Sequence, residues 1–197
     1  MTKKNTLDQL KKKNDGTMVL KDATAAGVSK TYFYSYIEKL GMVRSGRGVY
    51  QTKDTWVDDF ALLQRRCPEA VFSHDTALFF HDLTDREPHH LSVTVKTGYN
   101  PHRLKKDGVI VYSIKEGLLD LGSTVMTSPY GNSVKVYDVE RTICDVIRSR
   151  NRLETDAVLN AVKQYAKRRD KDIHKLMKYA ADLHVDKMVR HYLEVLL

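Results

Sequence analysis

The sequence lacks any apolar run close to the roughly 18 residues that a membrane-spanning helix needs, so we expect no integral membrane protein. Its first residues lead into a polar, lysine-rich segment rather than an apolar one. We therefore expect neither a signal peptide nor a lipid anchor, and a cytoplasmic location. Hydrophobic residues make up 42% of the 197 residues and the mean hydropathy is −0.46, values typical of a globular protein with a packed core.

Cysteine is scarce, and its placement excludes two classes of small scaffold. Cys67 and Cys144 stand among apolar neighbours, with no CxxC pair and no histidine at metal-ligand spacing. A zinc ribbon and a disulfide framework both need more cysteines in closer pairs. The chain also lacks the GxSxG, HExxH, P-loop and GxGxxG motifs. We expect no cofactor and no metal.

Two histidine–aspartate pairs are the best indication of an enzyme. His74-Asp75 and His81-Asp82 are seven residues apart, which would place both pairs on one face of a predicted helix over residues 74–83. Metal-dependent phosphohydrolases use such ligands. The alternative is a polar edge on a helix whose apolar residues pack in the core, because the further spaced ligands are absent. A hydrolase is therefore kept as an alternative to a non-enzymatic protein.

Positive charge is concentrated at the N-terminal end of the chain. Residues 1–56 hold 11 Lys and Arg against 5 Asp and Glu, whereas the remaining residues hold 22 against 20. The first segment therefore carries +6 of the net charge of +8. Such a segment is a candidate for binding a polyanion, although a solvated charged face is the commoner origin of lysine runs.

The N-terminal segment has the order of elements of a winged helix-turn-helix. Two short helices precede a tight turn at Gly27, and a longer helix is predicted over residues 30–40, with Phe33, Ile37 and Leu40 facing the core. A glycine-rich hairpin over residues 42–51 follows. In this fold the second helix of the motif enters the major groove of DNA and the wing contacts the backbone or the minor groove. The predicted DNA-contacting residues are Lys30, Thr31, Tyr34 and Ser35 of the helix and Arg44 and Arg47 of the wing.

The rest of the chain predicts a mixed domain. Strand-like runs cover residues 91–95, 109–112 and 134–137, and helical patterns cover residues 139–150, 154–168, 172–183 and 184–197. We predict an α+β protein: a winged helix-turn-helix over residues 1–54, then a mixed α/β domain over residues 55–197 that ends in a helical bundle. Arg141 and Asp145 are spaced to pair across one helical turn, either as a surface ion pair or with a buried Asp145 that ties the helix to the sheet.

Several segments resemble one known family, the antitoxins of AbiE type IV toxin–antitoxin systems (the AbiEi family). In the N-terminal part these are residues 20–22, 26–29 and 46–50; in the C-terminal part they are residues 73–78, 81–85 and 140–145. The resemblance spans nearly the whole chain. It implies an antitoxin that represses its own promoter, with repeated operator sites, through the N-terminal domain. It also implies that the C-terminal domain neutralises a nucleotidyltransferase-like toxin linked to abortive phage infection.

The resemblance also changes the interpretation of individual residues. It makes the two histidine–aspartate pairs part of the scaffold instead of metal ligands. No short motif carries the neutralising role, so the candidate antitoxin surface is drawn from basic residues of the C-terminal domain: Arg148, Lys163, Lys167 and Arg168. Besides the hydrolase, the remaining alternative is a stand-alone winged-helix regulator whose C-terminal domain senses a small molecule or dimerises.

Overall fold

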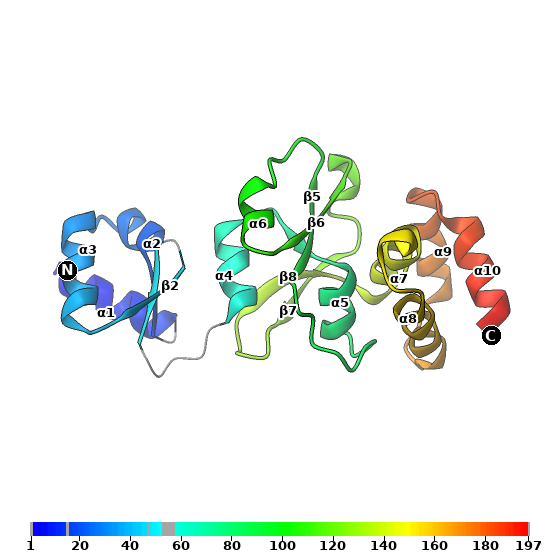
Figure 1. Cartoon of the computed structure of the whole chain (residues 1–197), viewed down its shortest axis with the longest axis horizontal. Coiled ribbons are helices and arrows are strands. Elements are labelled where there is room, and N and C mark those ends of the chain that lie inside the picture. The colour runs from blue at the N-terminus through cyan, green and yellow to red at the C-terminus, as the bar shows by residue number, and fades with distance from the viewer. Residues whose placement is uncertain (1, 15, 47, 53–57, 197) are drawn as a thin grey trace. The chain divides into compact units, whose positions relative to one another are not determined.

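The computed structural model describes residues 2–14, 16–46, 48–52 and 58–196. The chain divides into two compact units, Met1–Val57 and Asp58–Leu197, and each has its own hydrophobic core. Helices and sheets occur in both units, so the architecture is mixed α/β and compatible with the predicted α+β class (Figure 1).

The N-terminal unit consists of three helices and a small antiparallel sheet of strand order β1-β3-β2. Its elements follow the chain as α1 (Lys3–Lys13), β1 (Thr17–Val19), α2 (Leu20–Ala25), α3 (Lys30–Lys39), β2 (Val43–Gly46) and β3 (Val49–Gln51).

Helix α3 begins where the sequence predicts it, because Ser29 caps it by accepting a hydrogen bond from the third backbone N–H along the helix. Phe33 and Ile37 are buried, as predicted. The prediction that Leu40 joins them was wrong: its side chain is 41% exposed. Helix α3 ends just before it, and the next residue is a glycine with φ of 60° that turns the chain away. Tyr36 is buried instead and fills that part of the core.

The C-terminal unit is built on a five-stranded mixed sheet of order β6-β5-β4-β8-β7. The strands are β4 (Val71–Phe72), β5 (Ser92–Lys96), β6 (Ile110–Ile114), β7 (Ser123–Thr127) and β8 (Ser133–Tyr137). Strand β4 pairs antiparallel with β5 and parallel with β8, β5 and β6 are parallel, and β7 and β8 form an antiparallel hairpin.

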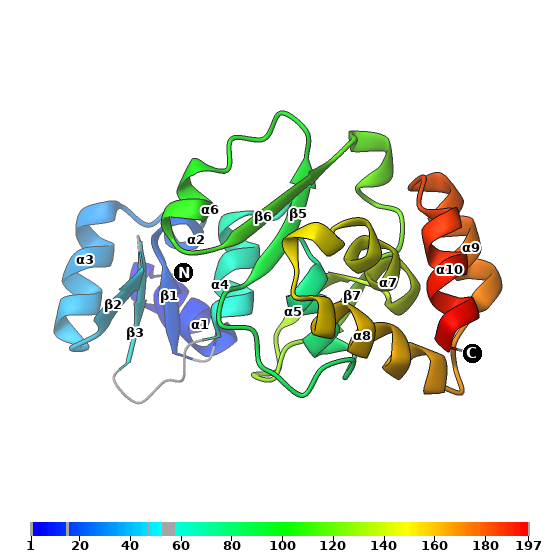
Figure 2. The same cartoon turned by 45° about the vertical axis from the view of Figure 1, so that its right-hand side comes forward.

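Helices cover both faces of this sheet. They are α4 (Asp59–Arg66), α5 (His74–Phe80), α6 (His102–Lys106), α7 (Val139–Arg148), α8 (Thr155–Lys167), α9 (Ile173–Asp182) and α10 (Asp186–Leu196), with 3-10 turns η1 (Glu116–Leu118) and η2 (Arg150–Arg152). Apolar residues of α4 and α6 pack with those of the sheet in one cluster, which also takes in Ala77, Phe79 and Phe80 of α5. Leu78 of α5 packs with residues of α7–α10 in a second cluster. Helices α4 and α6 lie on one side of the sheet, and α5 and α7 lie on the other (Figure 1, Figure 2). In the described part of the chain, no helix combines the length and apolar character that crossing a bilayer requires.

Candidate functional site

The predicted DNA-contacting side chains that the structure describes come from α3 and β2 of the N-terminal unit. Those in the described residues are all exposed: Lys30, Thr31, Tyr34 and Ser35 on α3 and Arg44 on β2. Arg47, predicted at the tip of the wing, lies outside the described residues. The four helical residues follow one another at i, i+1, i+4 and i+5 and therefore lie on one face of α3. The buried side chains of α3 lie on the opposite face.

Two of these side chains are held in place by their neighbours. The Arg44 Nε donates a hydrogen bond of 3.1 Å to the backbone oxygen of Gly46, within its own strand. The ring of Tyr34 lies edge-on to that of Tyr50 on β3, with 6.0 Å between the ring centroids. Aromatic contacts of this kind restrict side-chain rotation. These residues thus combine a phenol restricted by its neighbour with an exposed guanidinium that is anchored at its Nε.

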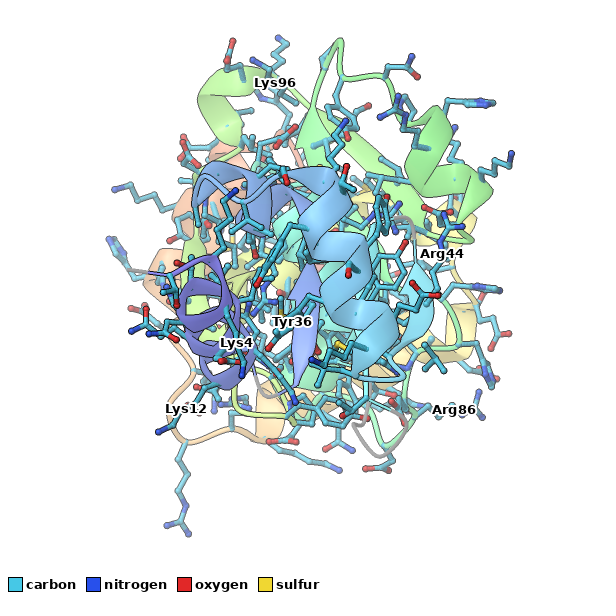
Figure 3. All side chains as sticks on the ribbon, turned by 90° about the vertical axis from the view of Figure 1, so that its left-hand side faces the viewer. Lys4, Lys12, Tyr36, Arg44, Arg86 and Lys96 are labelled. Carbon is cyan, nitrogen blue, oxygen red and sulfur yellow. The ribbon has the colours of Figure 1, made fainter. Side chains whose placement is uncertain are left out.

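A hydrogen bond joins α3 to α1. The Tyr36 hydroxyl donates to a carboxylate oxygen of Asp8 on α1 at 2.5 Å. Burial and this carboxylate together raise the pKa of Tyr36, so the phenol stays protonated as a donor. Figure 3 shows Tyr36 between α1 and α3, with Lys4 and Lys12 on α1 and Arg44 on the other side of α3. The contact is made on the buried side of α3, opposite the exposed residues.

His74 is the centre of a buried polar cluster in the C-terminal unit. It is fully buried with φ of 48°, a left-handed conformation that is uncommon outside glycine. Its Nδ1 lies 3.0 Å from the Ser73 Oγ and its Nε2 lies 2.9 Å from the Ser149 Oγ. Its ring stacks on that of Tyr112 with 3.4 Å between centroids. Burial lowers the pKa of His74 well below its usual value, and nearby arginines, first Arg148, lower it further, so the ring is neutral.

The other members of the two histidine–aspartate pairs do not join this cluster as a metal site. Helix α5 ends before His81, and Asp82 is exposed with φ of 54°, so the predicted shared helix face was wrong. The His81 Nε2 donates to the backbone oxygen of Tyr137 at 2.6 Å. Both histidines therefore use ring nitrogens in hydrogen bonds within the fold. Over the described residues, no three His, Cys, Asp or Glu side chains gather at metal-binding distances.

The ion pair between Arg141 and Asp145 is buried, which decides between the two predicted alternatives. Both side chains have 0% exposure, and the Arg141 Nε lies 3.0 Å from the Asp145 Oδ2. The Arg141 Nη1 also donates to the backbone oxygens of Leu118 and Leu121, at 2.9 and 2.6 Å. Asp145 forms a second ion pair, between its Oδ1 and the Nη2 of Arg148, at 3.0 Å. Arg141, and not Asp145, therefore connects α7 to the segment between β6 and β7.

The four residues of the candidate antitoxin surface have different surroundings. Lys163 and Lys167 are exposed on α8. Arg168 follows that helix; its Nη1 donates to the backbone oxygen of His81 at 2.9 Å, and its Nε and Nη2 pair with Asp170. Arg148 is three-quarters buried. Lys163 and Lys167 are the two that are exposed and make no ion pair within the described residues, so binding a partner would break no contact of that kind.

A hollow beside His74 was not predicted from the sequence. It has a volume of about 360 Å³, and its walls come from β6, the end of α7 and η2: Tyr112, Ser113, Arg148, Ser149, Asn151 and Arg152. The walls come from two segments more than thirty positions apart. No local sequence pattern indicates that these two segments meet. The close spacing of Arg148 and Arg152 was the one feature of the sequence that could have pointed to this hollow.

Comparisons with known proteins bear on the fold. Neither the protein-family models nor the curated proteins contain a match to this chain. Among solved structures, the fold is similar to that of the RV2827C protein from Mycobacterium tuberculosis, with a TM-score of 0.61 and 11% sequence identity. The alignment covers 89% of this chain and 69% of that one. At this identity the likeness concerns the arrangement of helices and strands.

Proposed function

We propose that the N-terminal unit is a winged helix-turn-helix that binds DNA. The observation that carries this proposal is the order of its elements, α1-β1-α2-α3-β2-β3, together with an exposed polar face on α3. In winged helices the helix equivalent to α3 enters the major groove, and the hairpin equivalent to β2–β3 lies on the backbone. The concentration of positive charge in residues 1–56 supplies the sequence-independent attraction to phosphates.

The exposed side chains of α3 have the chemistry that groove contacts require. Lys30, at the start of the helix, is suited to a phosphate or a guanine edge. Thr31 and Ser35 offer hydroxyls, and Tyr34 offers a phenol held by its neighbours. Arg44 can reach a phosphate from the wing. Glu38 lies on the exposed side nearer the end of the helix, where we place it away from the DNA.

We also propose that the chain is a non-enzymatic antitoxin that represses its own promoter and antagonises a nucleotidyltransferase-like toxin through the C-terminal unit. The sequence resemblance to AbiE antitoxins supports this. The internal hydrogen bonds of His74 and His81 add support, because they make these residues scaffold, as the resemblance implies. Lys163 and Lys167 are the best candidates for contact with the toxin, since both are exposed.

Salt dependence of DNA binding tests the first proposal. The full-length chain is titrated onto a duplex carrying its own promoter region at several KCl concentrations. We expect Lys30→Ala and Arg44→Ala each to reduce the slope of log affinity against log salt by about 0.9. Lys12→Ala removes the same charge from α1 and should leave the slope unchanged. Slopes for Lys30→Ala and Arg44→Ala that equal the wild-type slope would remove the assignment.

Growth rescue tests the second proposal. The chain is co-expressed with the neighbouring gene, and growth is scored for the wild type, for Lys30→Ala/Arg44→Ala and for Lys163→Glu/Lys167→Glu. We expect the first double variant to rescue growth and the second to fail. Rescue by the lysine variant would contradict the placement of the toxin surface. A neighbouring gene that encodes no nucleotidyltransferase would favour the alternative of a stand-alone regulator. In that case the hollow of the C-terminal unit would be the candidate site for a sensed ligand.

A further inference from the structure

The hollow in the C-terminal unit is lined by side chains that recognise anions. Arg148 and Arg152 present guanidinium groups, Ser113 and Ser149 present hydroxyls, and Asn151 presents an amide. Its volume of about 360 Å³ lies at the lower end of the range for small-molecule sites. Guanidinium groups bind phosphate oxygens with two parallel hydrogen bonds, which makes arginine the usual residue for this task.

The charges around the hollow leave a positive excess. Asp145 is the carboxylate in contact with these arginines, and its two oxygens are taken by Arg141 and Arg148. Arg152 instead lies over the ring of Tyr112, 4.2 Å from its centroid, and no ion pair is recorded for it in the described part of the chain. Asp75 also acts on Tyr112, whose pKa is raised mainly by burial, but it does not line the hollow. The lining of the hollow therefore contains two guanidinium groups, those of Arg148 and Arg152, and no carboxylate.

The two faces of the Tyr112 ring are both occupied. His74 stacks on it at 3.4 Å and Arg152 lies over it at 4.2 Å, and two groups so close to one centroid must lie on opposite faces. No face of the ring is left for a flat ligand to stack on. The hollow is therefore suited to a compact oxyanion and not to a ligand that stacks on Tyr112.

A chain of hydrogen bonds ends at Ser149, which lines the hollow. The Ser73 Oγ accepts from the Thr94 hydroxyl at 2.9 Å, and we assign the Ser73 proton to its hydrogen bond with the Nδ1 of His74. In a neutral ring the proton is then on Nε2, which donates to the Ser149 Oγ. The Ser149 proton is thereby free to donate to a ligand. The buried residues Ser73, His74 and Thr94 thus position the Ser149 hydroxyl as a donor at the wall of the hollow.

We propose that this hollow binds a phosphate-type oxyanion, the phosphoryl group of a small metabolite, with Arg148 and Arg152 as charge partners and Ser149 as a hydrogen-bond donor. The proposal is independent of DNA binding by the N-terminal unit. It gives the C-terminal unit a small-molecule ligand in addition to the partner protein proposed above.

Calorimetric titration of the full-length chain with inorganic pyrophosphate tests the proposal. We expect saturable one-site binding that Arg152→Gln weakens at least tenfold. Arg152 is exposed and makes no ion pair that the fold requires, so this variant should fold. Arg103→Gln, an exposed arginine on α6, is the matched control and should bind as the wild type does. Absence of binding, or equal binding by Arg152→Gln, would overturn the proposal.

Two further arms identify the site and the ligand group. Lys30→Ala/Arg44→Ala should retain pyrophosphate binding while losing DNA binding, and Arg152→Gln should show the reverse; loss of both activities in either variant would overturn the separation of the two sites. ATP should bind within about tenfold of pyrophosphate, because the adenine has no ring face to stack on. Binding of ATP that is far tighter would contradict a site that recognises only the phosphoryl group.

Discussion

Acidification should destabilise the C-terminal unit at an unusually high pH because His74 is buried as a neutral ring. In the unfolded chain a histidine takes up a proton with a pKa near 6.5. In the folded unit burial and the nearby arginines lower the pKa of His74 well below that value. Below about pH 6.5 the unfolded state therefore binds more protons than the folded state, and the free energy of unfolding falls as the pH falls.

The size of the effect follows from proton linkage. Between about pH 7.5 and pH 5.5 the unfolded histidine changes from nearly all neutral to about nine-tenths protonated, while His74 in the folded unit remains neutral. The free energy of unfolding should then fall by about 1.4 kcal/mol from His74 alone. The pKa of His81 is also lowered, mainly by burial, so its contribution has the same sign. Carboxylate titration in the unfolded chain begins lower, near pH 5. Burial raises the pKa of Asp75 in the folded unit, which acts with the opposite sign, so the difference between wild type and His74→Asn is the quantity that reports on His74.

Urea unfolding at several pH values measures the change, followed by amide resonances of α5 and α7 so that the C-terminal unit is observed by itself. His74→Asn removes the titrating group while asparagine tolerates the left-handed backbone. The matched control is His184→Asn, since His184 also has a positive φ but is exposed. The reasoning would be refuted if the free energy of unfolding did not fall between about pH 7.5 and pH 5.5. It would also be refuted if the slope of this free energy against pH were the same in His74→Asn as in the wild type. Should His74→Asn not fold, an imidazole resonance of wild-type His74 that titrates in this range would refute it equally.

Two further predictions concern the stability of the C-terminal unit and are measured by urea unfolding. Gly122→Ala should cost more than about 2 kcal/mol, because its φ is +73° and an added Cβ would lie 2.6 Å from the Cβ of buried Arg141; Gly98→Ala, with φ of +90° but open space, should cost only the backbone strain of about 1 kcal/mol. Equal losses would contradict the contact. Asp145→Asn should cost about 3–5 kcal/mol by leaving a buried guanidinium unpaired. Asp170→Asn, which breaks an exposed pair, should change stability little; a small loss in Asp145→Asn would be inconsistent with the buried pair.

The sequence predicted the elements whose local signals are strong. Helix α3 has a serine cap, a core-facing stripe and a glycine after its end, so its start was correct and its end was correct to one residue. The strands β5, β6 and β8 were found because β-branched residues cluster in them. Strand β4 was missed because it has only two residues, Val71 and Phe72, and owes its existence to the strands on either side. Strand β7 was missed because it is an edge strand, where Val125 is 66% exposed and no alternation is imposed.

The candidate sites divide in the same way. The exposed face of α3 follows from helical periodicity, so Lys30 and Tyr34 could be placed from the sequence alone. The surroundings of His74 could not, because its partner Ser149 is 75 positions away in the chain and Tyr112 arrives from a different strand. His74-Asp75 resembled a metal-binding pair for the same reason. The burial of His74 and its two hydrogen bonds exist only in the folded unit and leave no local signal in the sequence.

The short strand β4 has a consequence for the order in which the C-terminal unit folds. It is the only connection between two halves of the sheet within the described residues, and it makes the long-range pair Phe72–Val136. The β7–β8 hairpin closes over five residues, and β5 and β6 are joined through the short helix α6, so each half can form from local contacts. Contacts between distant residues form more slowly than local ones. Docking of β4 is therefore expected as the late step that turns two preformed half-sheets into one.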